Sequence, residues 1–269
     1  MVIFNNDKKI NNPERLTLTI YAGTENFSFS LYDPKETGSY FYKELTGENQ
    51  TDAFAAFKDV FFDNAFFSLP FGKVWIMYRT PIFTFIPNAI YEEKSKEDFL
   101  QFQFPENQGK TLNNVISYTG ISVIYKMPED VHRFMLLSFA KPDFIHYSAP
   151  FISYFLEKVK NVNNRRMVVN LQKKGLDIFC FSGETFLLGN YFKCSNLKEA
   201  IYYILYTWKQ LQFSQLDDFL HITGNSVFRE ELNNKLLLYI KNIYSLSIFP
   251  EIYFEGINTD HIPFELAAL

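Results

Sequence analysis

The sequence predicts an α/β protein built from two copies of one βββαβα plan, with a small α+β insert in the first copy. Between residues 166 and 192, three strand-like stretches alternate with two tight turns, and a helical stretch follows them. The same order of elements occurs near the N-terminus. At 269 residues the chain exceeds the commonest domain size, so two lobes are expected. We place the halves at 1–160 and 161–269, with the insert at about 80–143.

The first half opens with a meander of strands. Apolar and polar residues alternate at 16–21 and 26–32, which is the period of half-buried strands. After Pro34 and Gly38, a third strand is expected around 40–45. Asp52 is the expected N-cap of an amphipathic helix, because the run that follows has apolar residues at helical spacing. Residues 73–78 are predicted to form a buried strand after this helix.

The stretch from Thr80 to Ser148 differs from both meanders and predicts an inserted βαββα lobe. Pro128 stands at the first turn of its last helix, where the missing N–H costs nothing. The expected elements are a strand at 81–87, a helix at 92–102, paired strands at 113–118 and 121–126, and a helix at 128–139.

The second half repeats the plan. A returning strand at 144–148 and a connecting helix at 151–159 lead into a basic, Asn-rich linker. Asn196 and Glu199 have the spacing of a capping box that opens the helix after the second meander. The remaining expected elements are strands at 167–171, 176–181, 185–192, 218–223 and 252–254, a long helix at 227–244, and a final helical turn at 261–269.

Composition narrows the function classes. The net charge of −4 and the pI near 5.7 argue against a general nucleic-acid binder. Phe and Tyr, with 31 and 17 copies, predict a Phe-rich core rather than an aromatic surface for a peptide or sugar. Cys180 and Cys194 are the only two cysteines and form no CxxC pair or His-Cys cluster, so neither a disulfide framework nor a zinc site is expected. No signal-peptide pattern or membrane-length apolar run is visible, so a cytoplasmic protein is expected.

The order of elements resembles the actin-like ATPase superfamily, whose ribonuclease H-like halves also occur in sugar kinases and heat-shock chaperone ATPases. The insert after the fourth strand is similar to that of bacterial cell-division actin homologues and of the type IV pilus actin-like platform protein. The chain as a whole also resembles an uncharacterised domain-of-unknown-function family. These resemblances imply a nucleotide site with a recognisable set of loops.

In that superfamily each first hairpin carries an Asp-x-Gly turn, whose N–H groups bind phosphate and whose Asp holds magnesium through water. The first copy here keeps Gly23 and Thr24, but Tyr21 stands in the place of the Asp. In the second copy Asn170 replaces the Asp and Gln172 replaces the Gly. The resemblance therefore implies a degenerate nucleotide site without a magnesium-holding carboxylate, and we expect no metal site.

The adenosine-side turn of the superfamily is partly kept as Gly224, Asn225 and Ser226. Lys173 and Lys174 at the second hairpin tip could hold an anion, although a Lys pair in a turn is usually only solvated. We expect the Gly224 turn to end its strand, open the following helix and line whatever cleft lies between the halves. These residues, with Gly23, Thr24 and Asn170, are the candidate cofactor-binding positions.

Other polar residues give weaker signals. His221 lies between apolar residues in a strand, which favours a core or edge histidine over a catalytic base. Asp217 and Asp218 precede that strand and fit a loop and a cap. The basic run from Lys158 to Lys174 could meet an acidic partner or a phosphate backbone. No catalytic residue is assigned.

Three functional hypotheses remain open. The first is a non-catalytic actin-like scaffold, without cofactor, that binds a protein partner or peptide at the insert or between the halves, with a homodimer as one arrangement. The second is a diverged switch or ATPase that binds ATP with magnesium. The third is a sugar-kinase-like transferase, for which no carboxylate base can be placed.

Overall fold

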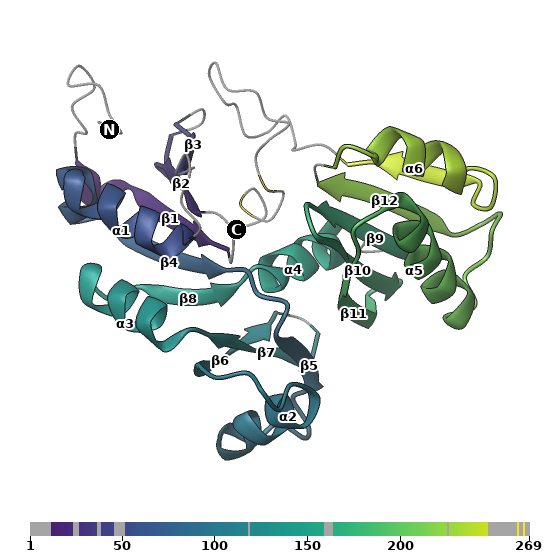
Figure 1. Cartoon of the computed structure of the whole chain (residues 1–269), viewed down its shortest axis with the longest axis horizontal. Coiled ribbons are helices and arrows are strands. Elements are labelled where there is room, and N and C mark those ends of the chain that lie inside the picture. Colours follow the sequence, from purple (N-terminus) through teal and green to yellow (C-terminus); the bar gives the residue numbers. More distant parts are fainter. Residues whose placement is uncertain are drawn as a thin grey trace. The chain divides into compact units, whose positions relative to one another are not determined.

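The computed structural model describes residues 12–23, 27–36, 39–45, 52–117, 119–158, 164–224 and 226–246, together with 263 and 266. The chain divides into two compact units (Figure 1). The first extends to Ala149, apart from the hairpin tip at 116–120, and the second begins at Pro150.

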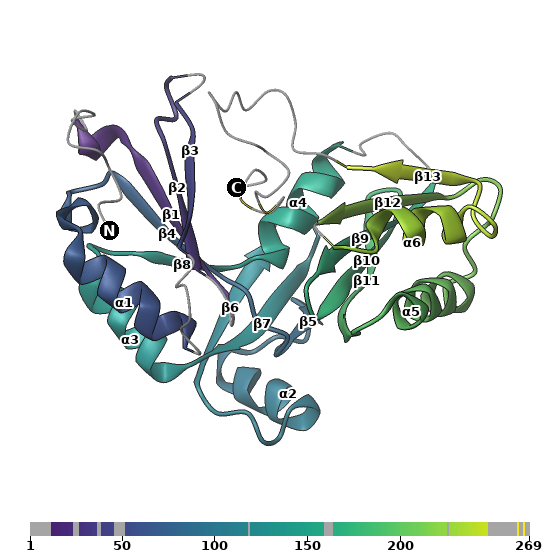
Figure 2. The same ribbon diagram turned by 45° about the horizontal axis from the view of Figure 1, so that its top comes forward.

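The first unit is built on a five-stranded sheet with the order β3-β2-β1-β4-β8. β1 is antiparallel to β2 and parallel to β4, as predicted, and β8 is parallel to β4. Helices α1 and α3 lie side by side against one face of this sheet (Figures 1 and 2), and Phe57 and Phe134 touch between them, with ring centroids 6.1 Å apart. The elements are β1 Thr17–Ala22, β2 Phe27–Tyr32, β3 Phe41–Leu45, β4 Lys73–Tyr78, β8 Asp143–His146, α1 Ala53–Asp63 and α3 Glu129–Ser138, with short 3₁₀ turns at Pro13–Arg15 and Ala65–Ser68.

Phenylalanine fills the core of the first unit. Phe29, Phe57 and Phe67 are buried, and the Phe29 and Phe67 centroids are 5.5 Å apart in an edge-to-face arrangement. Such pairs add to the large apolar area that each ring buries. The predicted Phe-rich core is confirmed. The helix that covers it begins as expected, since the Asp52 carboxylate accepts hydrogen bonds from the N–H groups of Phe54 and Ala55.

The insert forms a small three-stranded sheet with the order β5-β7-β6. Helix α2 packs on it through Leu100, which contacts Ile86 and Ile124. The Lys126 ammonium is buried and pairs with the Glu97 carboxylate, which also accepts a hydrogen bond from the Thr111 hydroxyl. This cluster ties α2 to two strands. The elements are β5 Phe83–Pro87, the 3₁₀ turn Glu93–Ser95, α2 Lys96–Gln103, β6 Lys110–Ile116 and β7 Ile121–Met127.

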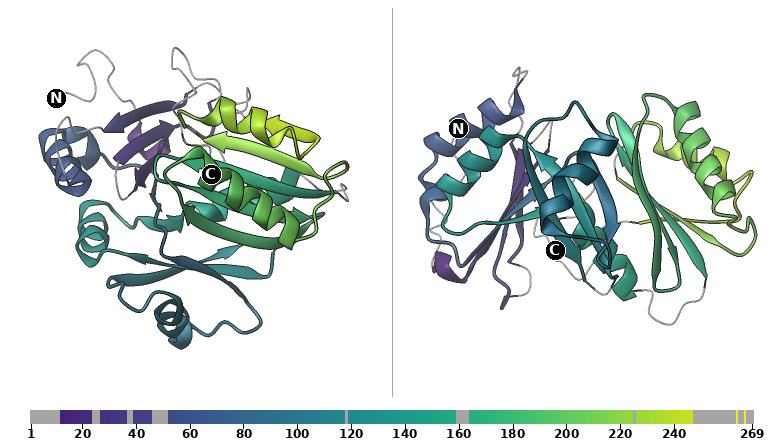
Figure 3. Two further views of the ribbon diagram at one scale, coloured as in Figure 1. Left: turned by 45° about the vertical axis from the view of Figure 1, so that its right-hand side comes forward. Right: turned by 90° about the horizontal axis from the view of Figure 1, so that it is seen from below.

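The second unit repeats the topology of the first, with the sheet order β11-β10-β9-β12-β13. β9 is antiparallel to β10 and parallel to β12, and β13 is parallel to β12. Helices α5 and α6 cover one face, and α4 lies against the other (Figures 2 and 3). The elements are α4 Ser148–Lys158, β9 Arg165–Gln172, β10 Gly175–Ser182, β11 Thr185–Lys193, α5 Leu197–Gln210, β12 Phe219–Gly224, α6 Arg229–Leu236 and β13 Asn242–Ser245.

Of two helices predicted for the second unit, the structure confirms the start of one and shortens the other. The Asn196 cap is confirmed, because its side chain accepts a hydrogen bond from the Glu199 N–H. The long helix at 227–244 is wrong: α6 ends at Leu236, and residues 242–245 form β13. Leu232, Leu236 and Ile240 are all buried, so their helical spacing continues past the end of the helix. The backbone groups that follow pair with β12 instead. The expected strand at 252–254 lies outside the described residues, as does nearly all of 261–269.

Among the described residues, no helix is both long enough and apolar enough to span a membrane.

Candidate functional site

The side chain of Asn170 is hydrogen-bonded within its own sheet. It lies near the end of β9, directly opposite Asp177 of β10, and its Nδ2 donates a hydrogen bond to Asp177 Oδ2 at 3.3 Å. Asn170 is 1% exposed and Asp177 is fully buried. The amide at the position of the superfamily's magnesium-holding Asp is therefore bound to a neighbouring strand rather than presented to solvent.

Gly224 packs against the same asparagine. It ends β12 with φ +81°, and a Cβ there would lie 2.2 Å from the Leu171 carbonyl oxygen and 2.7 Å from Asn170 Oδ1. L-residues are strained at this φ, and no side-chain atom fits the space. The structure thus brings together two of the predicted residues, and the approach of β9 to β12 is sufficient to require this glycine.

The turn after Gly224 leads to α6, which begins at Arg229. The prediction that this turn ends a strand and opens a helix is confirmed for its described part, and Asn225 lies outside the described residues. Ser226 contributes its carbonyl, which accepts a hydrogen bond from the Arg229 N–H at 3.1 Å.

The start of α6 already holds charges of its own. The Arg229 guanidinium donates to the carbonyls of Gly224 and Ile222 at 3.2 and 3.3 Å, which fixes the end of β12. Glu230 and Glu231 stand in the first turn. Carboxylates there favour the helix dipole but repel an incoming phosphate. This helix start is a poor anion site.

Lys173 and Lys174 form the exposed two-residue tip between β9 and β10. The Lys174 carbonyl accepts hydrogen bonds from Cys194 N at 3.2 Å and from the Tyr191 hydroxyl at 3.0 Å. The backbone of the tip is therefore part of the sheet's own bonding, and the two side chains are exposed.

In the first copy, a buried tyrosine occupies the position of the superfamily's Asp. Tyr21 is 3% exposed and lies opposite the fully buried Ser28 of β2. Gly23 follows β1 directly and is buried, and Thr24 lies outside the described residues. Tyr21 and Gly23 belong to the first unit, whereas Asn170, the lysine pair and Gly224 belong to the second.

These positions do not fit a magnesium–nucleotide group. Tyr21 and Asn170 bring no charge, and the Asp177 carboxylate that faces Asn170 is buried and bonded to it. Nowhere in the part of the chain that the structure describes do three or more His, Cys, Asp or Glu side chains gather as metal ligands.

The histidine with the largest pKa shift is structural. His146 ends β8, and burial lowers its pKa to about 3. Its Nδ1 is 2.7 Å from the Ser148 hydroxyl and its Nε2 is 3.5 Å from the Thr80 carbonyl oxygen. Both side chains of the His-Ser pair are fully buried, and no carboxylate of the described residues bonds to them, so a nucleophile would have no access to substrate.

A family model described as "Protein of unknown function (DUF3822)" matches residues 5–243. The chain belongs to the DUF3822 family. No curated protein matches it.

Solved structures place this DUF3822 chain among actin-like folds. A protein of Bacteroides thetaiotaomicron VPI-5482, with an actin-like ATPase fold and unknown function, is 31% identical, with a TM-score of 0.81 over 87% of this chain and 91% of that one. The PilM–PilN type IV pilus biogenesis complex matches with 10% identity and a TM-score of 0.55 over 93% and 96% of the two chains. The predicted actin-like α/β fold is confirmed.

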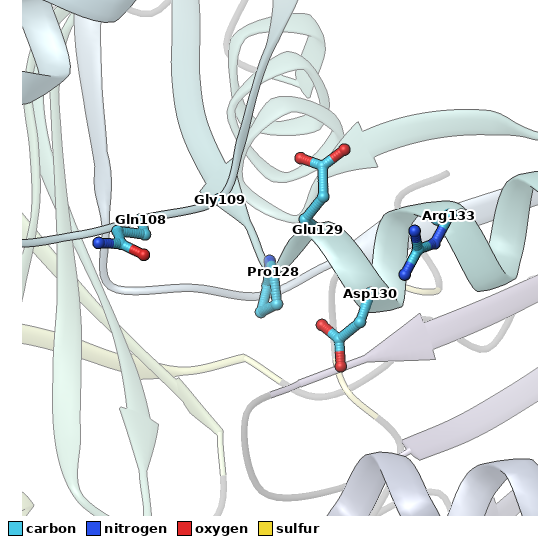
Figure 4. Close-up of a pocket in the computed structure, with 6 residues that line it drawn as sticks. All are labelled: Gln108, Gly109, Pro128, Glu129, Asp130 and Arg133. Carbon is cyan, nitrogen blue, oxygen red and sulfur yellow. The ribbon is translucent and has the colours of Figure 1, made fainter.

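A shallow hollow of about 440 Å³ lies at the start of α3 in the DUF3822 structure (Figure 4). Gln108, Gly109, Pro128, Glu129, Asp130 and Arg133 line it. The carboxylates of Glu129 and Asp130 point to different sides of the helix, so they do not converge on one ligand atom. None of the residues predicted for the nucleotide site lines this hollow.

Sequence reasoning missed two residues that decide the chemistry of this DUF3822 site. The position of Asp177 could have been predicted from the sequence. Lys173 and Lys174 make a two-residue turn, and counting outward along both strands from that turn places residue 177 opposite residue 170. The role of Arg229 could not be predicted from the sequence, because its hydrogen bonds to strand carbonyls depend on where the chain leaves β12.

Proposed function

We propose that this protein is a non-catalytic actin-like scaffold that binds a protein partner in the cytoplasm. The observation that carries the proposal is the state of Tyr21 and Asn170. Both side chains are buried, and that of Asn170 is hydrogen-bonded within its own sheet. They stand at the positions where the actin-like superfamily, which this chain resembles, carries magnesium-holding carboxylates.

The physics of phosphoryl transfer supports this proposal. Catalysis depends on positioning and on neutralising the charge that spreads over the transferred group, and magnesium supplies much of that neutralisation. Asn170 brings no negative charge to hold the ion, while Glu230 and Glu231 add negative charge at the helix start. Together these changes remove several kcal/mol of transition-state stabilisation, and each 1.36 kcal/mol is about tenfold in rate.

A partner-binding role agrees with one structural relative. The similar structure of the PilM–PilN type IV pilus biogenesis complex is that of an assembly of two proteins. For the present chain the partner is a proposal that rests on the shared fold and on the closed nucleotide positions. Neither feature identifies the partner.

The second candidate is an ATP-binding switch or ATPase that uses magnesium. Gly224 favours it, because a glycine with positive φ ends the strand that carries the adenosine-side turn of the superfamily. The contact with Asn170 gives this glycine a structural role of its own, which weakens the argument.

A thermal-shift measurement with and without ATP and magnesium separates the two candidates. A ligand at 100 times its dissociation constant stabilises a protein by roughly 2.7 kcal/mol. For a chain of this size that is a rise in Tm of roughly 5–10 °C. The scaffold proposal expects no rise and no phosphate release.

Hydrolysis that requires magnesium and disappears in Asn170→Ala would refute the scaffold proposal. Activity gained only when Asn170→Asp is combined with Tyr21→Asp would instead indicate descent from an ATPase.

A further inference from the structure

Arg166, His221 and Tyr244 come from three neighbouring strands and share one face of the second sheet. Arg166 of β9 is in register with Phe219 of β12, and His221 of β12 is in register with Tyr244 of β13. Residues in register point to the same side. This face is opposite the one that α5 and α6 cover, and α4 reaches its β10 side, where Phe155 contacts Phe181 (Figure 2). Over β12 and β13 this face is more open: Phe219 and His221 are half-buried, and Tyr244 is exposed.

Arg166 is a half-buried cation that has no counter-charge among the described residues. The structure gives its guanidinium no hydrogen bond or ion pair to any described residue, and burial lowers its pKa. Its neighbour Arg165 shows the usual arrangement, because that guanidinium donates to the carbonyls of Leu211 and Gln212. Because Arg166 is partly withdrawn from water and no described acidic residue pairs with it, its guanidinium is available to bind an anion from a partner.

His221 adds a second unsatisfied group on the same face. Its Nδ1 is buried without a hydrogen-bond partner among the described residues. Burial and the charge of Arg166 lower the pKa of His221 to about 4, which keeps the ring neutral near pH 7. A neutral imidazole with its proton on Nδ1 can donate one hydrogen bond to an oxygen.

The rim of this face is aromatic. Tyr244 is 48% exposed, and its ring lies 5.6 Å from that of His221 and 5.9 Å from that of Phe219. A small anion would leave these rings in water, whereas a polypeptide could cover them while its side chain reaches Arg166. The charge and the rings together favour an acidic peptide.

We propose that Arg166 and His221 bind a carboxylate side chain of a partner polypeptide, whose backbone and apolar residues cover Phe219 and Tyr244. The planar guanidinium matches a carboxylate with two parallel hydrogen bonds. This site deepens the proposed function, since it names the chemistry of the partner that the scaffold would hold.

The test measures binding of the full chain to a random copolymer of glutamate and tyrosine at fixed ionic strength. Arg166→Gln and His221→Phe should each weaken binding, the first by about tenfold or more, because a charge-assisted pair is lost. Arg133→Gln is the matched control, since Arg133 is exposed on α3 of the other unit. A copolymer of lysine and tyrosine should show no dependence on Arg166.

Equal binding by the wild type and Arg166→Gln would overturn the proposal, as would failure of the wild type to bind the acidic copolymer. A dimer of the free protein that dissociates in Arg166→Gln would assign the site to a second copy and also overturn it. Arg166→Leu should not lower the Tm of the free protein, because no internal bond is lost, whereas Arg165→Leu should. These outcomes are independent of the ATP measurement.

Discussion

Replacing Gly224 by alanine tests the closed arrangement of the candidate site. The added methyl group would meet the Leu171 carbonyl oxygen at 2.2 Å and Asn170 Oδ1 at 2.7 Å, at a backbone φ of +81°. The strained conformation costs about 1–2 kcal/mol in a residue with a Cβ. Moving Leu171 away breaks β9–β12 pairing, and a buried group left without its hydrogen bond costs about 1–3 kcal/mol more. We expect Gly224→Ala to lower the free energy of unfolding by about 2–5 kcal/mol.

Gly120→Ala is the matched control. Gly120 also has a positive φ, +66°, but a Cβ there meets nothing within 4 Å. Its cost is therefore the conformational strain alone, about 1–2 kcal/mol. The difference between the two variants measures the packing of β12 against β9.

Urea denaturation followed by tryptophan fluorescence can read each unit separately. Trp208 is buried in the second unit, and Trp75, the other tryptophan of the chain, lies in the first. In a Trp75→Phe background, the signal of Trp208 reports the unit that contains Gly224. In a Trp208→Phe background, the signal of Trp75 reports the first unit, whose insert carries Gly120 between β6 and β7. A Gly224→Ala cost within about 0.5 kcal/mol of the Gly120→Ala cost would refute the reasoning, because additive errors are of that size.

Two further predictions concern ionisable groups. Glu97→Ala should destabilise the insert by about 1–3 kcal/mol, because it leaves the buried Lys126 ammonium without its acceptor, whereas Lys126→Met should be nearly neutral in urea denaturation. The hydrogen bond from Lys126 lowers the pKa of Glu97, so the stability from this pair is present above pH 4.5 and is lost as pH falls further, which acid titration of Tm would detect. His146 has its pKa lowered from 6.5 to about 3, so the unfolded chain binds the extra proton first and stability falls from pH 6.5 downward. Between pH 7.5 and 5 this loss should be about 2 kcal/mol, and His146→Phe should remove it; an unchanged pH slope in that variant would contradict the assignment.

Sequence alone could predict the repeated sheets because their signal is local. Alternation marks the strands of both meanders, and side-chain caps at Asp52 and Asn196 mark the helices that follow. The strand at 242–245 was missed because Leu232, Leu236 and Ile240 keep helical spacing past the end of α6. Its strand pairing with β12 is a tertiary contact that no local pattern reveals.

The candidate site was predictable only in part, for the same reason. Asn170 and Gly224 were found from their motif positions, and the structure places them in contact. Arg166 and His221 are 55 positions apart in the sequence, and only the register of β9 with β12 brings them to one face. Whether an arginine has an internal partner depends on such contacts, so its free guanidinium could not be predicted.

The pairing of Asn170 with Asp177 means that residue 170 cannot be changed without regard to the acid that faces it. The acid stands on β10, directly opposite the position on β9 where the superfamily carries it, and the amide on β9 donates to it. An aspartate at residue 170 would place two carboxylates against each other in a buried position, where their like charges repel. The two residues therefore constrain each other, because the amide donates a hydrogen bond to the buried acid at 177. Asn170→Asp alone should therefore lower the free energy of unfolding in urea, and adding Asp177→Asn should recover much of that loss, because one acid then faces one amide again.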